Sequence, residues 1–167
     1  MAHRLFIAVP VRLYRYETIR REYGPVLEGR WREESTLHVT VAFLGNAFEP
    51  SELMERLEPF SWEFTPTELD TLEYFSSSRV FVATTINPSL QRMRDRLEAV
   101  LGLPHEQLRP HATLMRVKRI SDKETFLSSL PKSFPEALGI LEPKVSLYES
   151  RLTPEGARYT VRKEWSA

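Results

Sequence analysis

The chain has 167 residues, of which 41% are hydrophobic and 28% charged, a composition typical of a globular protein with one hydrophobic core. Its 23 basic and 23 acidic side chains cancel, which argues against binding long nucleic acid through a broad positive surface. The absence of cysteine excludes disulfides, a thiol nucleophile and a zinc–thiolate site. Because no apolar run approaches the ~20 residues of a membrane helix, we expect a cytoplasmic protein without a membrane span.

The first half of the chain predicts five elements in the order strand, helix, strand, helix, strand. Apolar spacing places them at residues 4–11, 14–27, 37–44, 52–57 and 62–75. We expect Ser51 or Pro50 to be the N-terminal cap of the second helix.

The second half repeats this order. Its elements are predicted at residues 79–85, 88–101, 112–117, 126–130 and 144–152, with Gly102 ending the first helix and a capping box from Ser121 to Glu124 beginning the second. The first strands of the two halves begin 75 residues apart (79 − 4). A hairpin with its turn at 153–156 and its last strand at 158–165 ends the chain. We therefore expect one domain, 1–167, internally duplicated as approximately 1–76 and 77–167.

The central strand of each half carries a His-x-Thr-x motif. The two copies are His38-Val39-Thr40-Val41 and His111-Ala112-Thr113-Leu114, 73 residues apart (111 − 38). Side chains two apart on a strand point to the same face, so a pair of such strands presents two imidazoles and two hydroxyls to one cleft. A single copy is more often structural, whereas two copies in matching contexts favour a functional site. The remaining histidines, His3 and His105, are interpreted as surface residues.

These four side chains suit acid–base chemistry on a phosphate. An imidazole titrates near pH 6.5 when unperturbed, so one histidine can take a proton while the other gives one. The threonine hydroxyls and nearby cations can hold the non-bridging phosphate oxygens. The sequence therefore predicts phosphodiester cleavage or transfer. With this pair in place, no cysteine and no glycine-rich phosphate loop, we expect neither a metal ion nor a cofactor.

Segments spread over nearly the whole chain resemble a known family, the two-histidine (2H) phosphoesterase superfamily. Within it they are most similar to the bacterial RNA 2',3'-cyclic phosphodiesterases, also called 2'-5' RNA ligases or LigT-like proteins. The segments that carry the resemblance are RLFIAVP, LHVTVAFLGN, RPHATLMRVK and the terminal YESRLTPEGARYTVRKEW.

The resemblance implies a bilobal α+β fold with two lobes related by a pseudo-twofold axis. Each lobe is an antiparallel sheet with helices on its outer side, and the motif strands line a central cleft. The implied reaction is hydrolysis of a terminal 2',3'-cyclic phosphate on RNA to a 2'-phosphate, with reversible 2'-5' ligation in some members. Carried over by residue, His38 is the proton donor to the leaving ribose oxygen, His111 the base that activates water, Thr40 and Thr113 the phosphate-binding hydroxyls, and Arg116 a phosphate-contacting cation.

Strict alternation conflicts with one of these roles. It places Arg116 on the face opposite His111, so Arg116 needs a bulge, a strand end or a long reach to meet a phosphate. The alternative is an exposed arginine in a basic run. By the same alternation Phe43 lies opposite His38 and is predicted to be a core residue.

Charge and aromatic residues are unevenly distributed. Residues 49–73 hold eight acidic side chains against Arg56 alone, whereas residues 109–119 hold four basic side chains and no acid. The substrate is therefore expected near the second motif. Trp31 and Tyr148 are the candidates for stacking on a nucleobase. Trp62 and Trp165 are interpreted as packing residues.

Two alternative functions stay open. One keeps the chemistry but acts on small cyclic nucleotides or ADP-ribose cyclic phosphate. The other is a nucleotide- or RNA-binding module that has lost turnover, although the presence of both histidines and both threonines argues against it. We expect the partners to be RNA ends or small nucleotides carrying a cyclic phosphate, and the protein to be a monomer with no obligate protein partner.

Overall fold

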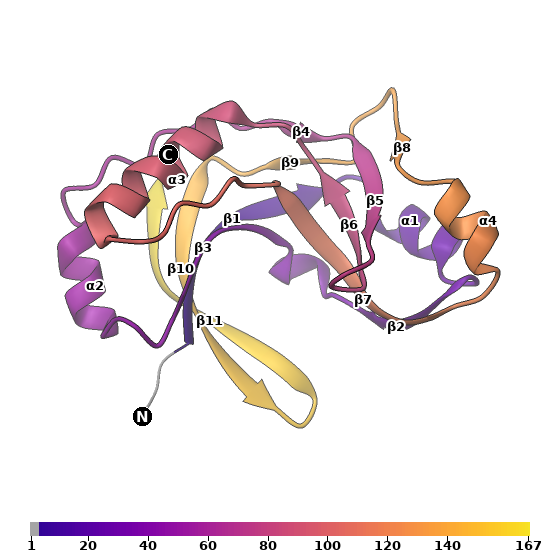
Figure 1. Ribbon diagram of the computed structural model, residues 1–167, viewed down its shortest axis with the longest axis horizontal. Helices are drawn as coiled ribbons and strands as arrows, with labels where there is room; N and C mark the ends of the chain where they lie inside the picture. The colour runs from indigo at the N-terminus through magenta and orange to yellow at the C-terminus, as the bar shows by residue number, and fades with distance from the viewer. Residues whose placement is uncertain (1–3) are drawn as a thin grey trace.

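The computed structural model describes residues 4–167 (Figure 1), so His3 lies outside the described residues. The strands are β1 (Arg4–Leu13), β2 (Leu27–Trp31), β3 (His38–Gly45), β4 (Glu68–Leu69), β5 (Thr71–Phe75), β6 (Val80–Thr84), β7 (His111–Ile120), β8 (Lys132–Ser133), β9 (Gly139–Leu141), β10 (Lys144–Thr153) and β11 (Gly156–Ser166). The helices are α1 (Tyr16–Tyr23), α2 (Pro50–Leu57), α3 (Pro88–Leu101) and α4 (Lys123–Ser128), with a 3-10 turn η1 (Glu34–Thr36) before β3.

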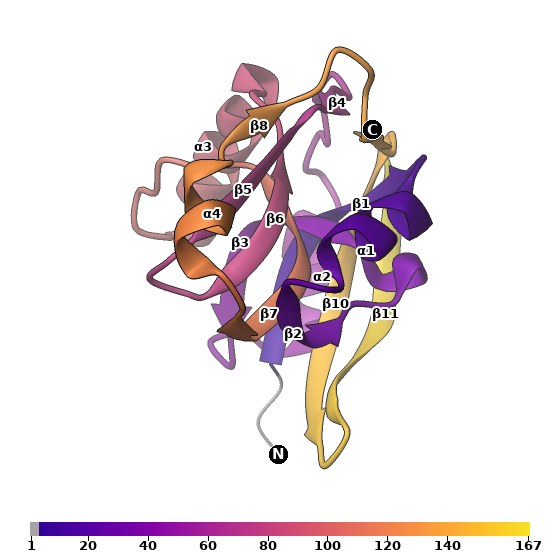
Figure 2. The same ribbon diagram turned by 90° about the vertical axis from the view of Figure 1, so that its right-hand side faces the viewer.

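The strands form one curved antiparallel sheet. Its order is β11-β10-β1-β3-β7-β6-β5-β8, with β2 paired to β7 and β9 paired to both β1 and β4. Helices α2 and α3 lie beside the β1, β3 and β10 part of the sheet, and α1 and α4 lie beside the β5, β6 and β7 part (Figures 1 and 2). This arrangement is the α+β fold with two lobes that the resemblance implies.

The two lobes meet where the motif strands pair. Strands β3 and β7 are joined through Val39 opposite Ala112, which are equivalent positions of the two motifs. Each lobe takes strands from both halves of the sequence, because β10 pairs with β1 and β5 pairs with β6. The pseudo-twofold axis therefore passes between the motifs, although the lobes are not the two consecutive halves. The duplication of 1–76 and 77–167 stays a prediction about the sequence.

The predicted helix over 14–27 is wrong over its last four residues. Helix α1 ends at Tyr23, and the chain then forms β2, a strand that local spacing did not indicate. The pairing of β2 with β7, from Leu27 opposite Ile120 to Trp31 opposite Met115, joins segments far apart in the chain. Long-range hydrogen bonds thus override a weak helical periodicity.

Three predicted boundaries also need correction. Helix α2 begins at Pro50 after Glu49, with no side-chain cap, so Ser51 lies inside its first turn. Helix α4 is capped by Asp122, which accepts a hydrogen bond from the Thr125 amide, and the predicted capping box is wrong. The predicted strand over 62–75 is present only as the short β4 and β5. The Gly102 end of α3 and the terminal β10–β11 hairpin are confirmed.

A continuous apolar cluster fills the space between the sheet and the helices. Trp62 is buried and stacks on Trp165 at 4.5 Å between ring centroids, so both are packing residues as predicted. Within residues 4–167, no helix is long and apolar enough to cross a membrane.

Both motif strands carry a bulge at the same place. In the β1–β3 pair, Ile7 faces Ala42 and Ala8 faces Thr40, which leaves Val41 extra. In the β6–β7 pair, Phe81 faces Met115 and Val82 faces Thr113, which leaves Leu114 extra. Each extra residue reverses the alternation, so residues five after each motif histidine return to its face.

Candidate active site

All five predicted site residues line one cleft. The cleft has a volume of about 1380 Å³ and its wall includes His38, Thr40, His111, Thr113 and Arg116. The bulge at Leu114 brings Arg116 to the face of His111, which is the local distortion that alternation required. Neither threonine hydroxyl has a hydrogen-bond partner among residues 4–167, so both remain available to a ligand in the cleft.

Both histidines are held in the same way. The Nδ1 atom of His38 lies 2.7 Å from the Thr36 carbonyl oxygen, and the Nδ1 atom of His111 lies 2.7 Å from the Arg109 carbonyl oxygen. A carbonyl only accepts, so each Nδ1 carries the proton that it donates, and each neutral ring has its lone pair on Nε2. The two Nε2 atoms are therefore the proton-transfer atoms that the cleft offers.

Aromatic rings fix both imidazoles but enclose them unequally. Phe6, Tyr148 and Tyr159 lie 5.1, 5.7 and 5.5 Å from the His38 ring, measured between centroids. His111 has one such neighbour, Phe75 at 4.9 Å. The pseudo-twofold relation is thus kept in the hydrogen bonds and broken in the apolar surroundings.

This enclosure shifts the acidity of one histidine. Burial lowers the pKa of His38 below its usual 6.5, and the nearby charges of Arg32 and His111 lower it further, against the opposing hydrogen bond to Thr36. In the unliganded cleft His38 is therefore biased toward its neutral form at neutral pH. An anion in the cleft acts in the opposite direction because it stabilises the imidazolium.

The cleft is strongly cationic although the whole chain is neutral. Its described wall holds one carboxylate, Glu106, and seven basic side chains: Arg4, Arg30, Arg32, Arg79, Arg109, Arg116 and Lys118. Three of these belong to the basic run of residues 109–119, so the expected substrate side is consistent with the geometry. The other four come from β1, β2, the segment after β2 and the turn before β6, and sequence order alone did not bring them together.

Not every member of that basic run is available to a ligand. Arg109 lies 2.6 Å from the Glu73 carboxylate and 4.3 Å above the Phe75 ring. Arg119 does not line the cleft and lies 3.8 Å from Glu28. Arg116 and Lys118 have no ion-pair partner among residues 4–167.

The structure does not support the predicted roles of three aromatic residues, Trp31, Tyr148 and Phe43. Trp31 packs against Tyr16 and Phe81 and does not line the cleft, so its proposed stacking role is wrong. Tyr148 stacks on Phe6 beside His38 but is likewise not part of the cleft wall. Phe43, predicted to be core, is 76% exposed and lines the cleft because the Val41 bulge turns it outward.

Tyr159 also lines the cleft and was missed. It comes from β11, where it lies opposite Ser150 and reaches the His38 ring. No motif marks it, because its position depends on the pairing of the last hairpin with β1.

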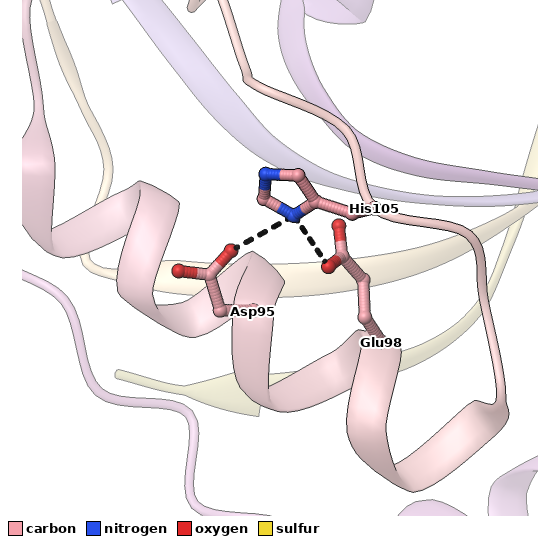
Figure 3. Close-up of side chains that lie close together, drawn as sticks. All are labelled: Asp95, Glu98 and His105. Atoms are coloured by element: carbon pink, nitrogen blue, oxygen red, sulfur yellow. Dashed lines mark hydrogen bonds and ion pairs between the residues drawn. The ribbon is translucent and has the colours of Figure 1, made fainter.

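One cluster outside the cleft has the residue types of a metal site. Asp95, Glu98 and His105 offer ligand atoms within 4.8 Å of one another (Figure 3). The Glu98 carboxylate, however, already accepts hydrogen bonds from Arg94 Nε, from His105 Nδ1 and from the Glu106 amide. The hydrogen bonds and ion pairs of this cluster therefore hold the segment before β7 against α3.

Comparison with known proteins identifies relatives over the whole chain. The family model described as the 2'-5' RNA ligase superfamily matches residues 10–144. A protein of Methanocaldococcus jannaschii named RNA 2',3'-cyclic phosphodiesterase is 28% identical over 179 residues, which covers 97% of this chain and 99% of the relative.

Solved structures agree with the fold. The crystal structure of Escherichia coli LigT in apo form matches with a TM-score of 0.74 and 24% identity, covering 99% of this chain and 97% of that one. LigT complexed with 3'-AMP matches with a TM-score of 0.75, 21% identity and coverage of 99% and 98%. A structure described as a phosphoesterase matches with a TM-score of 0.73, 23% identity and coverage of 98% of each chain. These likenesses confirm the predicted LigT-like fold.

Proposed function

This chain belongs to the 2'-5' RNA ligase superfamily of 2H phosphoesterases, and we propose that it hydrolyses terminal 2',3'-cyclic phosphates on RNA to 2'-phosphates. One observation carries the proposal: His38 and His111 lie on paired strands, donate through Nδ1 to equivalent carbonyls, and line one cationic cleft. The name of the M. jannaschii relative supports the substrate.

In the proposed mechanism the two histidines act in the same displacement at one phosphorus atom. His111 Nε2 takes a proton from water as the water oxygen attacks in line, and the bond from phosphorus to the ribose O3' breaks. His38 Nε2 gives its proton to O3', which leaves a 2'-phosphate. Thr40, Thr113 and Arg116 hold the non-bridging oxygens and stabilise the charge that develops there. With the 5'-hydroxyl of a second RNA in place of water, the same attack forms a bond from phosphorus to O5' and breaks the bond to O3', which gives 2'-5' ligation.

Turnover of defined substrates tests the proposal. We expect a cyclic-phosphate-ended oligonucleotide to give a 2'-phosphate, identified by phosphorus NMR, at the same rate in excess EDTA as without it, because the side chains of the cleft supply both proton transfer and charge stabilisation. Activity that is lost on chelation and returns with a divalent metal contradicts the metal-independent mechanism. Binding without turnover of the oligonucleotide, of 2',3'-cyclic mononucleotides or of ADP-ribose cyclic phosphate contradicts an enzyme and supports a binding module.

The pH dependence should report the unusual acidity of His38. A mechanism that needs neutral His111 and charged His38 gives a bell-shaped profile, whose two limbs belong to the coupled pair rather than to either histidine alone. Burial lowers the pKa of His38 in the free protein, whereas a bound phosphate anion raises it. The alkaline limb should therefore lie at higher pH in kcat, which reports the complex, than in kcat/KM, which reports the free enzyme. A profile that is flat across the imidazole range refutes proton transfer by this pair.

A further inference from the structure

The cationic part of the cleft extends along β7 beyond the motif. After the Leu114 bulge, Arg116 and Lys118 are both exposed and line the cleft. At ~3.3 Å per residue, Lys118 lies on the order of 20 Å along the strand from His111. Arg79, which also lines the cleft, donates from its guanidinium to the Lys118 carbonyl oxygen at 2.6 Å. The row of cations is thus longer than a single cyclic phosphate can occupy.

Strand β2 adds a cation directly opposite this row. Arg30 and Arg116 are cross-strand partners, and both line the cleft. Like charges directly opposite each other destabilise a sheet. Neither arginine has an ion-pair partner among residues 4–167, so nothing in the described chain offsets the repulsion.

The same two strands show the opposite arrangement two residue pairs further along. Glu28 of β2 and Arg119 of β7 are also cross-strand partners. Their charged groups form an ion pair at 3.8 Å, and neither residue lines the cleft. Unpaired cations therefore occur only where this strand pair faces the cleft. That contrast points to an anion outside the chain as the missing partner of Arg30 and Arg116.

The opposite wall of the cleft carries less charge, with Arg4 as the cation that β1 contributes. The position equivalent to Arg116, five residues after the first motif histidine, is the exposed Phe43. The β10–β11 hairpin, which extends beyond the sheet in Figure 1, also contributes Leu152 and Ala157 to the wall of the cleft. Arg30 reaches toward this hairpin, since a Cβ at Gly156 would lie 2.9 Å from its Nη1 atom. The broken symmetry concentrates the cations on the β2 and β7 side of the cleft, with Arg4 of β1 on the other side.

We propose that Arg30, opposite Arg116 on β2, and Lys118, beyond Arg116 on β7, bind the phosphodiesters that precede the terminal nucleotide of an RNA, so that the enzyme prefers cyclic-phosphate-ended oligonucleotides to 2',3'-cyclic mononucleotides. The inference rests on the proposed function, since the cyclic phosphate must sit between the histidines. The next anions along an RNA are then the phosphodiesters on the 5' side of the terminal ribose. A 5'-phosphate on a mononucleotide offers the same chemistry but only one charge group.

The test compares kcat and KM for 2',3'-cyclic AMP, its 5'-phosphorylated form and a cyclic-phosphate-ended tetranucleotide. We expect Arg30→Ala and Lys118→Ala each to raise KM for the tetranucleotide about tenfold, with kcat unchanged and with KM for 2',3'-cyclic AMP within about twofold of wild type. Each change should also reduce the slope of log KM against log salt by about 0.7 for the tetranucleotide. Arg119→Ala, the matched control on the same strand, should alter neither substrate.

Three outcomes overturn the inference. An equal rise in KM for the tetranucleotide and 2',3'-cyclic AMP places the cations at the cyclic phosphate. An equal effect of Arg119→Ala indicates a general electrostatic contribution. If the 5'-phosphorylated mononucleotide has the same KM as the tetranucleotide, the cations bind only one phosphate beyond the cyclic phosphate.

The inference can fail separately from the proposed function. If no substrate turns over, fluorescence anisotropy of a labelled tetranucleotide ending in a 2'-phosphate still measures how tightly Arg30 and Lys118 bind the phosphodiesters. Weaker binding by Arg30→Ala and Lys118→Ala but not by Arg119→Ala then supports the inference. Equal binding by wild type and all three variants refutes it. Thermal unfolding of each variant verifies that the fold is retained.

Discussion

Replacing either motif histidine should nearly abolish turnover: His38→Ala and His111→Ala are each expected to lower kcat by about 10²-fold to 10⁴-fold, the usual contribution of a positioned acid or base. The fold should persist, because each imidazole faces the cleft and its Nδ1 hydrogen bond is made to a backbone carbonyl. The measurement is single-turnover hydrolysis of a cyclic-phosphate-ended oligonucleotide, together with thermal unfolding of each variant.

The matched control is His105→Ala. His105 is exposed, lies outside the cleft and interacts with the carboxylates of Glu98 and Asp95. Its replacement should leave kcat unchanged. Because acid and base act on the same reaction step, the double variant His38→Ala/His111→Ala should be little worse than either single variant. Near-normal activity in one single variant refutes its role in proton transfer.

Much of the cleft could be predicted because its chemistry is local. The His-x-Thr spacing places two side chains on one strand face whatever the rest of the fold does. Two copies in similar apolar runs then predict two similar strands. The placement of His38 and His111 in one cleft is therefore the part of the structure that the sequence predicts best.

The missed residues are those placed by non-local structure. The bulges at Val41 and Leu114 depend on the register with β1 and β6, so alternation misplaced Phe43 and left Arg116 uncertain. Arg30 lies on β2, a strand whose existence depends on pairing with β7. Tyr159 reaches His38 only because the last hairpin adds to the sheet beside β1.

The bulge at Val41 has its own buried support, Arg94 of α3. The guanidinium of Arg94 donates to the Val41 carbonyl oxygen at 3.1 Å, to the Pro104 carbonyl oxygen at 2.9 Å and to Glu98 at 2.7 Å. Arg94 is 3% exposed. One side chain thus joins the first motif strand, the segment that leads to the second motif, and the helix between them.

Arg94→Met should therefore destabilise the protein by roughly 2–5 kcal/mol, because two backbone carbonyls lose a donor and each unsatisfied group costs about 1–3 kcal/mol. Arg92→Met is the matched control, since Arg92 is exposed on the same helix. Urea unfolding at neutral pH measures both. Equal free energies of unfolding for the two variants contradict a supporting role for Arg94.

The same substitution should change how stability depends on pH. The hydrogen bond from Arg94 is the largest of the effects that lower the pKa of Glu98 from 4.5 to about 2. A carboxyl whose pKa is lower in the folded state stabilises the fold above its unfolded pKa, and this contribution is lost as pH falls through the folded value. Wild-type stability should thus decline from about pH 4.5 toward pH 2, and Arg94→Met should flatten that decline. If the slopes of wild type and Arg94→Met coincide across this window while Arg92→Met also matches them, Arg94 does not hold Glu98 in its ionised form.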